Sequence, residues 1–374
     1  MATALSPTIS PIVMPKWGLS MKEGTVNEWL VDDGAEISVG MPILDVETDK
    51  IANAVEAPDA GTLRRKVAQA GDVLPVKALL GVLAPAEVSD AEIDAYVSAY
   101  ETPADDDGEE EAAPAYQFID VDGIRVRYAR KGDGPQTVLF IHGFGGDLDN
   151  WLFNLDPLAD AYTVVALDLP AHGQTSPRLA GTTLAEMAGF VGRFMDEAGI
   201  ASAHVVGHSM GGGIAAQLAV DAPQRVLSVA LVSPAGLGEE VNSDYTGGFV
   251  SAQSRRELKP VIELLFANAD LVSRQLLDDL LRYKRLDGVP EALAALGGSL
   301  FANGRQREQP GLRLADSGKR TLVVWGARDQ IIPSSHAAHA PAGATVKIFD
   351  DAGHMSQMEK AGDFNALLRR HLQG

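Results

Sequence analysis

The stretch AHVVGHSMGGGIAAQLAV, residues 203–220, decides the fold of the larger part of this chain. It begins as an apolar run typical of a strand, passes through small residues, and continues as a run typical of a helix. At the junction, residues 207–211 form a G-x-S-x-G motif. A sharp strand-to-helix turn strains the serine backbone and requires small neighbours, and it places Ser209 at a helix N-terminus, which favours developing negative charge. We predict that Ser209 is a nucleophile; the alternative is a small-residue turn that serves helix–sheet packing alone.

The same alternation of apolar runs and helical stretches extends over residues 115–374. Runs this continuously apolar indicate strands buried on both faces, with helices covering the sheet. The pattern predicts an α/β domain with a mainly parallel sheet, whose site lies at the carboxyl ends of the strands. The predicted strands cover residues 137–143, 162–168, 203–209, 227–234, 321–329 and 345–354.

Serine becomes an effective nucleophile only when a neighbouring base takes its proton. The chain has 8 histidines. His354 is the best candidate because it follows the last predicted strand, late in the chain, as a Ser…Asp…His order requires. The carboxylate that orients the base is expected after an intermediate strand, and TLVVWGARD (321–329) ends on Asp329. Asp168, also at a strand end, is the rival.

A tetrahedral intermediate of acyl transfer needs two backbone N–H groups aimed at its oxyanion. Met210, directly after the nucleophile, supplies one of them. We expect the other from the glycine-rich loop HGFGG, residues 142–146, and choose the N–H of Phe144 because it follows the His-Gly pair. The alternative for this loop is an ordinary glycine turn.

The first part of the chain contains a weak internal repeat. Residues 34–46, GAEISVGMPILDV, align with residues 71–83, GDVLPVKALLGVL. Short apolar stretches between Gly, Pro and Asp indicate brief strands, so the repeat predicts two small sheets with approximate two-fold symmetry. Between the two halves lies ETDK (47–50), which places Lys50 on a polar turn between two strand-like stretches.

The formal net charge of −20 is unevenly distributed. Residues 1–100 carry 15 acidic and 7 basic side chains, residues 101–113 carry seven acidic and no basic ones, and the remainder has a net charge of only −5. A block composed like residues 101–113 buries almost nothing apolar and repels itself, which predicts a disordered acidic linker. The predicted organisation is a small all-β domain at 10–86, a short helix and linker at 87–114, and the α/β domain at 115–374.

Composition excludes several classes of protein. The absence of cysteine rules out disulfides, a thiolate nucleophile and any Cys-based metal site, and we expect no metal. A chain this acidic repels phosphate backbones, so we expect no nucleic-acid partner. No apolar run is long enough to span a bilayer, and the N-terminus lacks the pattern of a signal peptide. We expect a cytoplasmic protein with no membrane partner.

Residues 12–84 resemble the lipoyl domains of the 2-oxo-acid dehydrogenase complexes, through MPKWGLSMKEG, ETDK and Gly61. The resemblance implies lipoate in amide linkage on Lys50, where the alternative is one more exposed lysine on a polar turn. The related biotinyl domains centre their lysine between methionines. Asp49 and Ile51 flank Lys50 instead, which favours lipoate over biotin.

Residues 115–374 resemble the α/β-hydrolase family over nearly the full domain, through HGFGGDLDNW, LDLPAHGQTSP, VVGHSMGGGIA, VVWGARDQIIP and DAGHMSQMEK. The resemblance implies a catalytic triad of Ser209, Asp329 and His354. It also implies that residues from about 236 to 300, rich in Leu and Ala at helical spacing, form a helical lid that shapes the acyl pocket.

A lipoyl domain joined to an α/β-hydrolase domain resembles the dihydrolipoyl acetyltransferase components of acetoin dehydrogenase systems. The resemblance implies transfer of acetyl from dihydrolipoyl-lysine to the co-substrate coenzyme A in acetoin catabolism. It implies two partners in a multienzyme complex, a thiamine-diphosphate-dependent E1 enzyme and dihydrolipoamide dehydrogenase. The chain departs from ordinary acyltransferase components, because it has no H-x-x-x-D-G motif and because the helix expected within residues 87–100 is too small for a subunit-binding domain.

Two other functions stay open on the sequence. The same triad serves a hydrolase, such as a thioesterase or esterase that releases the free acid, because water and a thiol attack the same acyl-enzyme. The other function is not enzymatic: the chain would be a carrier scaffold, whose lipoyl arm visits partner subunits while the large domain only docks them.

Overall fold

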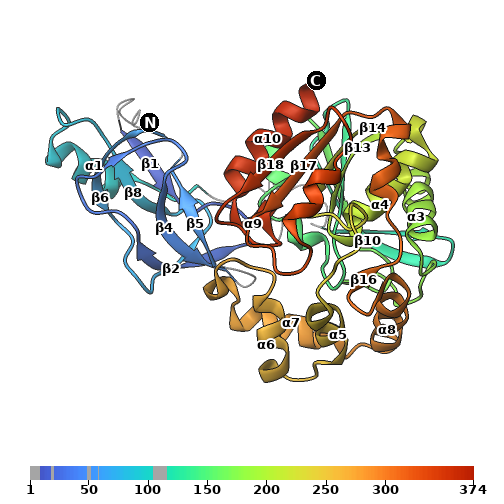
Figure 1. Cartoon of the computed structure of the whole chain (residues 1–374). Helices are drawn as coiled ribbons and strands as arrows, with labels where there is room; N and C mark the ends of the chain where they lie inside the picture. The colour runs from blue at the N-terminus through green and yellow to red at the C-terminus, as the bar shows by residue number, and fades with distance from the viewer. Residues whose placement is uncertain (1–8, 18–20, 49–51, 58, 104–115) are drawn as a thin grey trace. The chain divides into compact units, whose positions relative to one another are not determined.

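The computed structural model describes residues 9–17, 21–48, 52–57, 59–103 and 116–374. The chain divides into two compact units, residues 1–113 and residues 114–374, drawn from blue to red along the chain in Figure 1. Most of the predicted acidic linker lies outside the described residues.

The first unit consists of two four-stranded antiparallel sheets. Strands related by the sequence repeat lie in opposite sheets: β3 (Glu36–Ile37) corresponds to β7 (Val73–Pro75), and β4 (Pro42–Glu47) corresponds to β8 (Leu79–Leu83). The repeat therefore marks the approximate two-fold arrangement that the sequence predicts. One sheet contains β1 (Ser10–Val13), β8 (Leu79–Leu83), β6 (Gly61–Lys66) and β3 (Glu36–Ile37); the other contains β5 (Ala52–Glu56), β4 (Pro42–Glu47), β2 (Glu23–Trp29) and β7 (Val73–Pro75).

Apolar side chains from both sheets, among them Ile43 and Leu63, fill the core of this unit. Close packing across the core requires a glycine at position 81, since a Cβ there would lie 2.8 Å from the Trp29 ring. The Trp29 ring is fixed in turn, because its Nε1–H donates to the Ala68 carbonyl oxygen at 2.9 Å.

The helix expected within residues 87–100 is α1 (Asp90–Ala99), which begins with a capping box between Ser89 and Glu92. Its buried side chains Ile93 and Tyr96 pack in a second apolar cluster on the sheet that contains β8. The helix therefore belongs to the compact body of the first unit and is not part of an extended linker.

The second unit is built on an eight-stranded sheet in the order β18-β17-β14-β13-β11-β12-β10-β9. The six strands from β18 to β12 are parallel and coincide with the six predicted runs. They are β11 (Thr137–Ile141), β12 (Thr163–Leu167), β13 (Ala203–His208), β14 (Val226–Val232), β17 (Thr321–Gly326) and β18 (Thr345–Phe349). Each strand is shorter than its predicted run, and β17 and β18 are shortened most, because the polar clusters after Gly326 and Phe349 form the loops that carry site residues.

Two antiparallel strands, β9 (Gln117–Val121) and β10 (Ile124–Lys131), extend the sheet and were not predicted. The described helices of this unit lie on both faces of the sheet (Figure 1): α3 (Leu184–Glu197) and α4 (Met210–Asp221) on one face, and α10 (Ala361–Gln373) on the other. Short α2 (Leu155–Leu158) and α9 (Ser356–Glu359) lie near α10.

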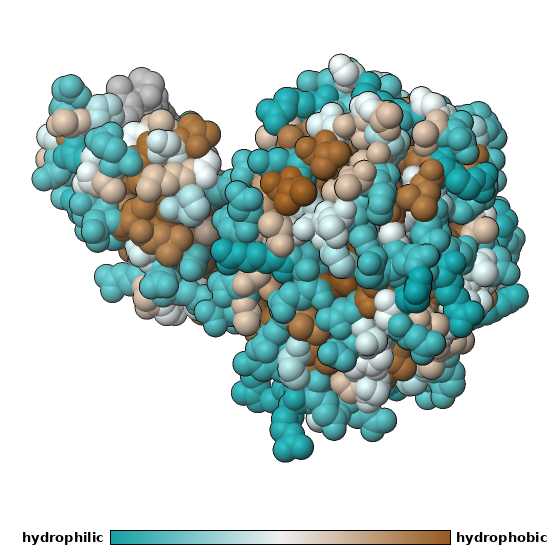
Figure 2. Space-filling view, in the orientation of Figure 1, coloured by the Kyte–Doolittle hydropathy of each residue, from teal (hydrophilic) through white to brown (hydrophobic). Residues whose placement is uncertain are grey.

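Four helices between β14 and β17 form a separate layer, which occupies the segment predicted as a lid. They are α5 (Ser243–Ser251), α6 (Arg255–Glu263), α7 (Arg274–Lys284) and α8 (Val289–Leu300). The layer lies at one end of the sheet, at the bottom of the large unit in Figure 1. Figure 2 shows that its outer surface in this view is mostly hydrophilic. None of the helices in the described ranges is long and apolar enough to cross a membrane.

A buried charge cluster ties β10 to the loops above the sheet. The guanidinium of Arg127, a residue 2% exposed, contacts the Asp149 and Asp168 carboxylates, each at 3.2 Å. Asp168 also accepts backbone hydrogen bonds from Leu148 and Gln174, each at 2.8 Å. Asp168, the alternative to Asp329 in the sequence analysis, therefore has a structural role in a buried ion-pair cluster.

Replacing Arg127 with Met is expected to destabilise the large unit by about 3–5 kcal/mol, because two carboxylates remain buried without their counter-charge. The loss can be measured by calorimetric or urea unfolding of the full chain. The triple variant Arg127→Met, Asp149→Asn, Asp168→Asn, which removes the stranded charges, should recover part of it. A loss below about 1 kcal/mol, typical of a surface pair, would contradict this account.

Candidate active site

Ser209 lies on a strained turn between β13 and α4. Its backbone has φ 52° and ψ −119°, outside the regions that residues with a side chain favour. The flanking glycines make the turn possible: a Cβ on Gly207 would lie 2.2 Å from the Gly211 carbonyl oxygen, and one on Gly211 would lie 2.2 Å from that of Ile141. This is the geometry that the G-x-S-x-G motif predicts.

His354 and Asp329 meet at the carboxyl ends of the neighbouring strands β18 and β17. His354 Nδ1 lies 2.8 Å from Asp329 Oδ2, and both side chains are buried. Asp329 is held by three further donors, the backbone N–H groups of Ile331 at 2.8 Å and Ile332 at 3.0 Å and the Trp325 Nε1–H at 3.0 Å. A carboxylate that accepts this many hydrogen bonds orients an imidazole firmly.

His208, directly before the nucleophile, connects Ser209 to the His354 loop. Its Nε2–H donates to the His354 carbonyl oxygen at 3.1 Å, and the two rings are 4.7 Å apart. Burial holds the pKa of His208 well below its ordinary value, and His354 lowers it further, so the ring is neutral. The sequence did not single out His208, although its hydrogen bond holds the loop of the predicted base.

The glycine-rich loop after β11 passes directly over the serine. A Cβ on Gly143 would lie 2.9 Å from the Ser209 Cβ. The Tyr245 hydroxyl, from α5, donates to the Phe144 carbonyl oxygen at 2.9 Å and so fixes the loop. Met210 begins α4, where N–H groups have no partner within the helix. Within the described part of the chain, neither the Phe144 nor the Met210 N–H has a hydrogen-bond acceptor.

His142 supports this loop and was not singled out from the sequence. Its Nδ1 lies 2.8 Å from the Gly143 carbonyl oxygen, and its Nε2 accepts the Leu169 N–H at 2.9 Å. Burial, together with the neighbouring His172, holds the pKa of His142 well below the ordinary value, so the ring stays neutral. The signal that could have identified it is its position as the first residue of HGFGG.

The predicted lipoyl site falls at a strand junction of the first unit. β4 and β5 pair antiparallel up to Glu47 opposite Ala52. Lys50, between these two residues in sequence, lies outside the described residues. A lysine that follows the last paired residues of a small rigid two-sheet body fits an attached carrier group. In the ranges that the structure describes, no group of His, Asp and Glu side chains could hold a metal ion.

The molecule thus combines an α/β-hydrolase fold, with a serine on a nucleophile turn, and a carrier-type two-sheet module. Residues 136–361 match the family model of the alpha/beta hydrolase fold, and residues 10–83 match that of the biotin-requiring enzymes, which covers biotinyl and lipoyl modules. A solved meta-cleavage product hydrolase from Pseudomonas fluorescens IP01 has the same fold, with a TM-score of 0.62 and 24% identity over 69% of this chain and 97% of that one.

Two curated relatives match the chain from end to end. The dihydrolipoyllysine-residue acetyltransferase component of the acetoin cleaving system of Cupriavidus necator is 84% identical over all 374 residues of both chains. The component of the same name from Pseudomonas putida is 46% identical over 97% of this chain and 99% of its own. The chain belongs to this family of acetyltransferase components of acetoin cleaving systems.

Replacing Asp329 with Asn is expected to slow labelling of Ser209 by a fluorophosphonate about 10⁴-fold, because the imidazole loses the carboxylate that orients it and stabilises its protonated form. Intact-mass measurement of the labelled protein over time gives the rate. Asp350→Asn, which changes an exposed carboxylate close to His354 in sequence, is the matched control and should label at the parent rate. Equal rates for the two variants would exclude Asp329 from the site.

Proposed function

We propose that this chain moves an acetyl group from a dihydrolipoyl thioester on Lys50 to coenzyme A, through an acetyl-enzyme on Ser209. The observation that carries the proposal is the presence, in one chain, of a carrier module and a buried His354–Asp329 pair that His208 joins to the nucleophile turn of Ser209. Lipoate in amide linkage to Lys50 would supply a thiol that holds the acetyl group as a thioester. Residues 10–86, together with the helix α1 that packs on them, would then be the carrier, the rest of residues 87–114 the connection and residues 115–374 the catalytic domain.

In the first step, Ser209 Oγ attacks the thioester carbonyl carbon while His354 Nε2 takes the hydroxyl proton. The Oγ–C bond forms, the C–S bond breaks, and His354 gives the proton to the departing sulfur. Asp329 stabilises the imidazolium between these two transfers. The N–H groups of Phe144 and Met210 bind the oxyanion of the tetrahedral intermediate.

In the second step, His354 takes the proton of the coenzyme A thiol, and the sulfur attacks the acetyl carbon. The new C–S bond forms as the C–Oγ bond breaks, and the proton returns to Ser209. The lid helices support this outcome over hydrolysis, because the Phe249 ring on α5 and the Phe301 ring after α8 each lie 5.9 Å from the Phe144 ring and surround the oxyanion loop with apolar surface. Such surface keeps water from the acetyl-enzyme.

The proposal places the chain in the cytoplasm, where coenzyme A and reduced thiols are available, in agreement with a sequence that contains no cysteine. A thiamine-diphosphate-dependent E1 enzyme would load the carrier. A dihydrolipoamide dehydrogenase would reoxidise it after each transfer.

A product assay tests the transfer. With acetyl-dihydrolipoamide as donor and coenzyme A as acceptor, the parent should form acetyl-CoA in excess over acetate. Ser209→Ala should lower the rate by a factor on the order of 10⁴ to 10⁶. Excess acetate from the parent would indicate a hydrolase instead, and an unchanged rate in Ser209→Ala would exclude the acetyl-enzyme.

Attachment of the carrier group is tested by intact mass. Protein made in cells that synthesise lipoate should gain the mass of one lipoyl group, and Lys50→Arg should abolish that gain because arginine offers no amine for the amide bond. Lys66→Arg, which alters another lysine of the same unit, is the control and should remain fully modified. A parent protein without the added mass would contradict the assignment.

A further inference from the structure

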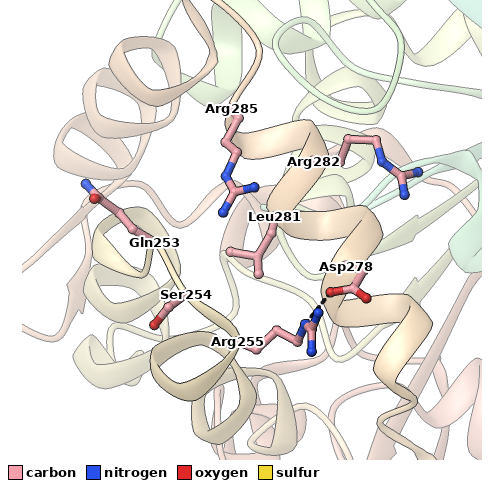
Figure 3. A pocket seen from close by; sticks show the side chains of 7 residues that line it. All are labelled: Gln253, Ser254, Arg255, Asp278, Leu281, Arg282 and Arg285. Atoms are coloured by element: carbon pink, nitrogen blue, oxygen red, sulfur yellow. Dashed lines mark hydrogen bonds and ion pairs between the residues drawn. The ribbon is translucent and has the colours of Figure 1, made fainter.

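A cavity of about 530 Å³ opens in the helical layer between the start of α6 and the second half of α7, away from Ser209. This volume lies within the usual range for small-molecule sites. Its walls are polar and largely basic (Figure 3). The lining residues are Gln253, Ser254, Arg255, Asp278, Leu281, Arg282 and Arg285.

Three arginines against one aspartate give the cavity a positive charge, in a domain whose net charge is −5. Arg255 is paired with Asp278, and Arg282 is paired outside the cavity with Asp279. Among the described residues, Arg285 has no carboxylate partner, and its guanidinium points into the hollow above Leu281 (Figure 3). A guanidinium presents a planar fork of N–H donors suited to phosphate oxygens.

The cavity is connected through α5 to the oxyanion loop. Lys284, next to Arg285, donates to the carbonyl oxygens of Phe249 and Ala252 at the end of α5. The Phe249 ring lies 5.9 Å from the Phe144 ring on the other side. A second hollow of about 350 Å³, along α5 and the start of α6, shares Gln253 with the first. The two hollows therefore follow one another along the end of α5 and the start of α6.

We propose that this cavity binds the phosphates of coenzyme A, with Arg285 as the principal contact and Arg255 and Arg282 as supporting charges. The inference rests on the proposed function and adds to it the place where the acceptor is held. Coenzyme A carries its phosphates and its thiol at opposite ends of a long pantetheine arm, so its phosphates can be held in a basic cavity of the helical layer that does not itself include Ser209. The acidic carrier unit is the other anionic partner, but a concave pocket suits a nucleotide better than a convex protein surface.

The experiment compares Arg285→Glu with Arg256→Glu in the full chain. Arg256 lies one residue from Arg255 and is exposed but does not line the cavity, so the control makes the same change of charge on the same layer. In the transfer assay the acetyl acceptors are coenzyme A and pantetheine, which has the thiol without the phosphates. Binding of coenzyme A is measured separately by calorimetry. Arg285→Glu should raise the KM and the Kd for coenzyme A about tenfold or more, and should lower the preference for coenzyme A over pantetheine by the same factor. Arg256→Glu should leave that preference unchanged.

The outcomes separate the site from the function. Acetyl-CoA formation by the parent together with an unchanged KM and Kd in Arg285→Glu would overturn the site and leave the transfer intact. A raised KM for the acetylated carrier unit, with no change for coenzyme A, would assign the cavity to the carrier and also overturn the proposal. A parent that forms acetate only would refute the proposed function, while the calorimetric comparison would still decide whether the cavity binds coenzyme A.

Discussion

The backbone of Ser209 is the constraint on which the rest of the large unit depends. A serine at φ 52° is strained, and such strain persists only where the surroundings determine it fully. Here the Ser209 N–H donates to the Val232 carbonyl oxygen at 2.9 Å, and the Ser209 carbonyl oxygen accepts from Gly212 and Ala235, each at 2.9 Å, and from Gly213 at 3.2 Å. The strand, the following helix and the loop after β14 therefore all hold this one residue.

The remaining groups are placed relative to that turn by buried polar contacts. His208 joins it to the His354 loop, and the donors around Asp329 fix the orientation of the imidazole. Arg127 fixes the loops that follow β11 and β12, through its ion pairs with Asp149 and Asp168. These side chains are buried with their partners, so their contacts are rigid and define where a carbonyl carbon can be attacked.

Much of the fold could be predicted because the six parallel strands are buried on both faces and are therefore continuously apolar. Strands β9 and β10 were not predicted because their charged residues interrupt the continuous apolar runs that mark the parallel strands, and because Arg127 is buried at a position where an apolar side chain is expected. The repeat in the first unit predicted two sheets, because glycines and apolar residues at aligned positions of the two halves form equivalent turns and strands. The sequence favoured Asp329 but kept Asp168 as its rival, because both follow strands. The structure places Asp329 against His354 and Asp168 against Arg127, contacts between residues distant in sequence. The supporting histidines, His142 and His208, were not identified because their contacts with Leu169 and His354 join residues distant in sequence.

The central claim is that the acetyl group passes through Ser209, and rapid-quench peptide mass spectrometry tests it most directly. Protein mixed with acetyl-dihydrolipoamide in the absence of acceptor, then quenched, should carry one acetyl group on the peptide that contains Ser209. Addition of coenzyme A before the quench should remove that group and yield an equal amount of acetyl-CoA. Formation of acetyl-CoA at the full rate, with no acetyl group on Ser209 at any time, would contradict the account.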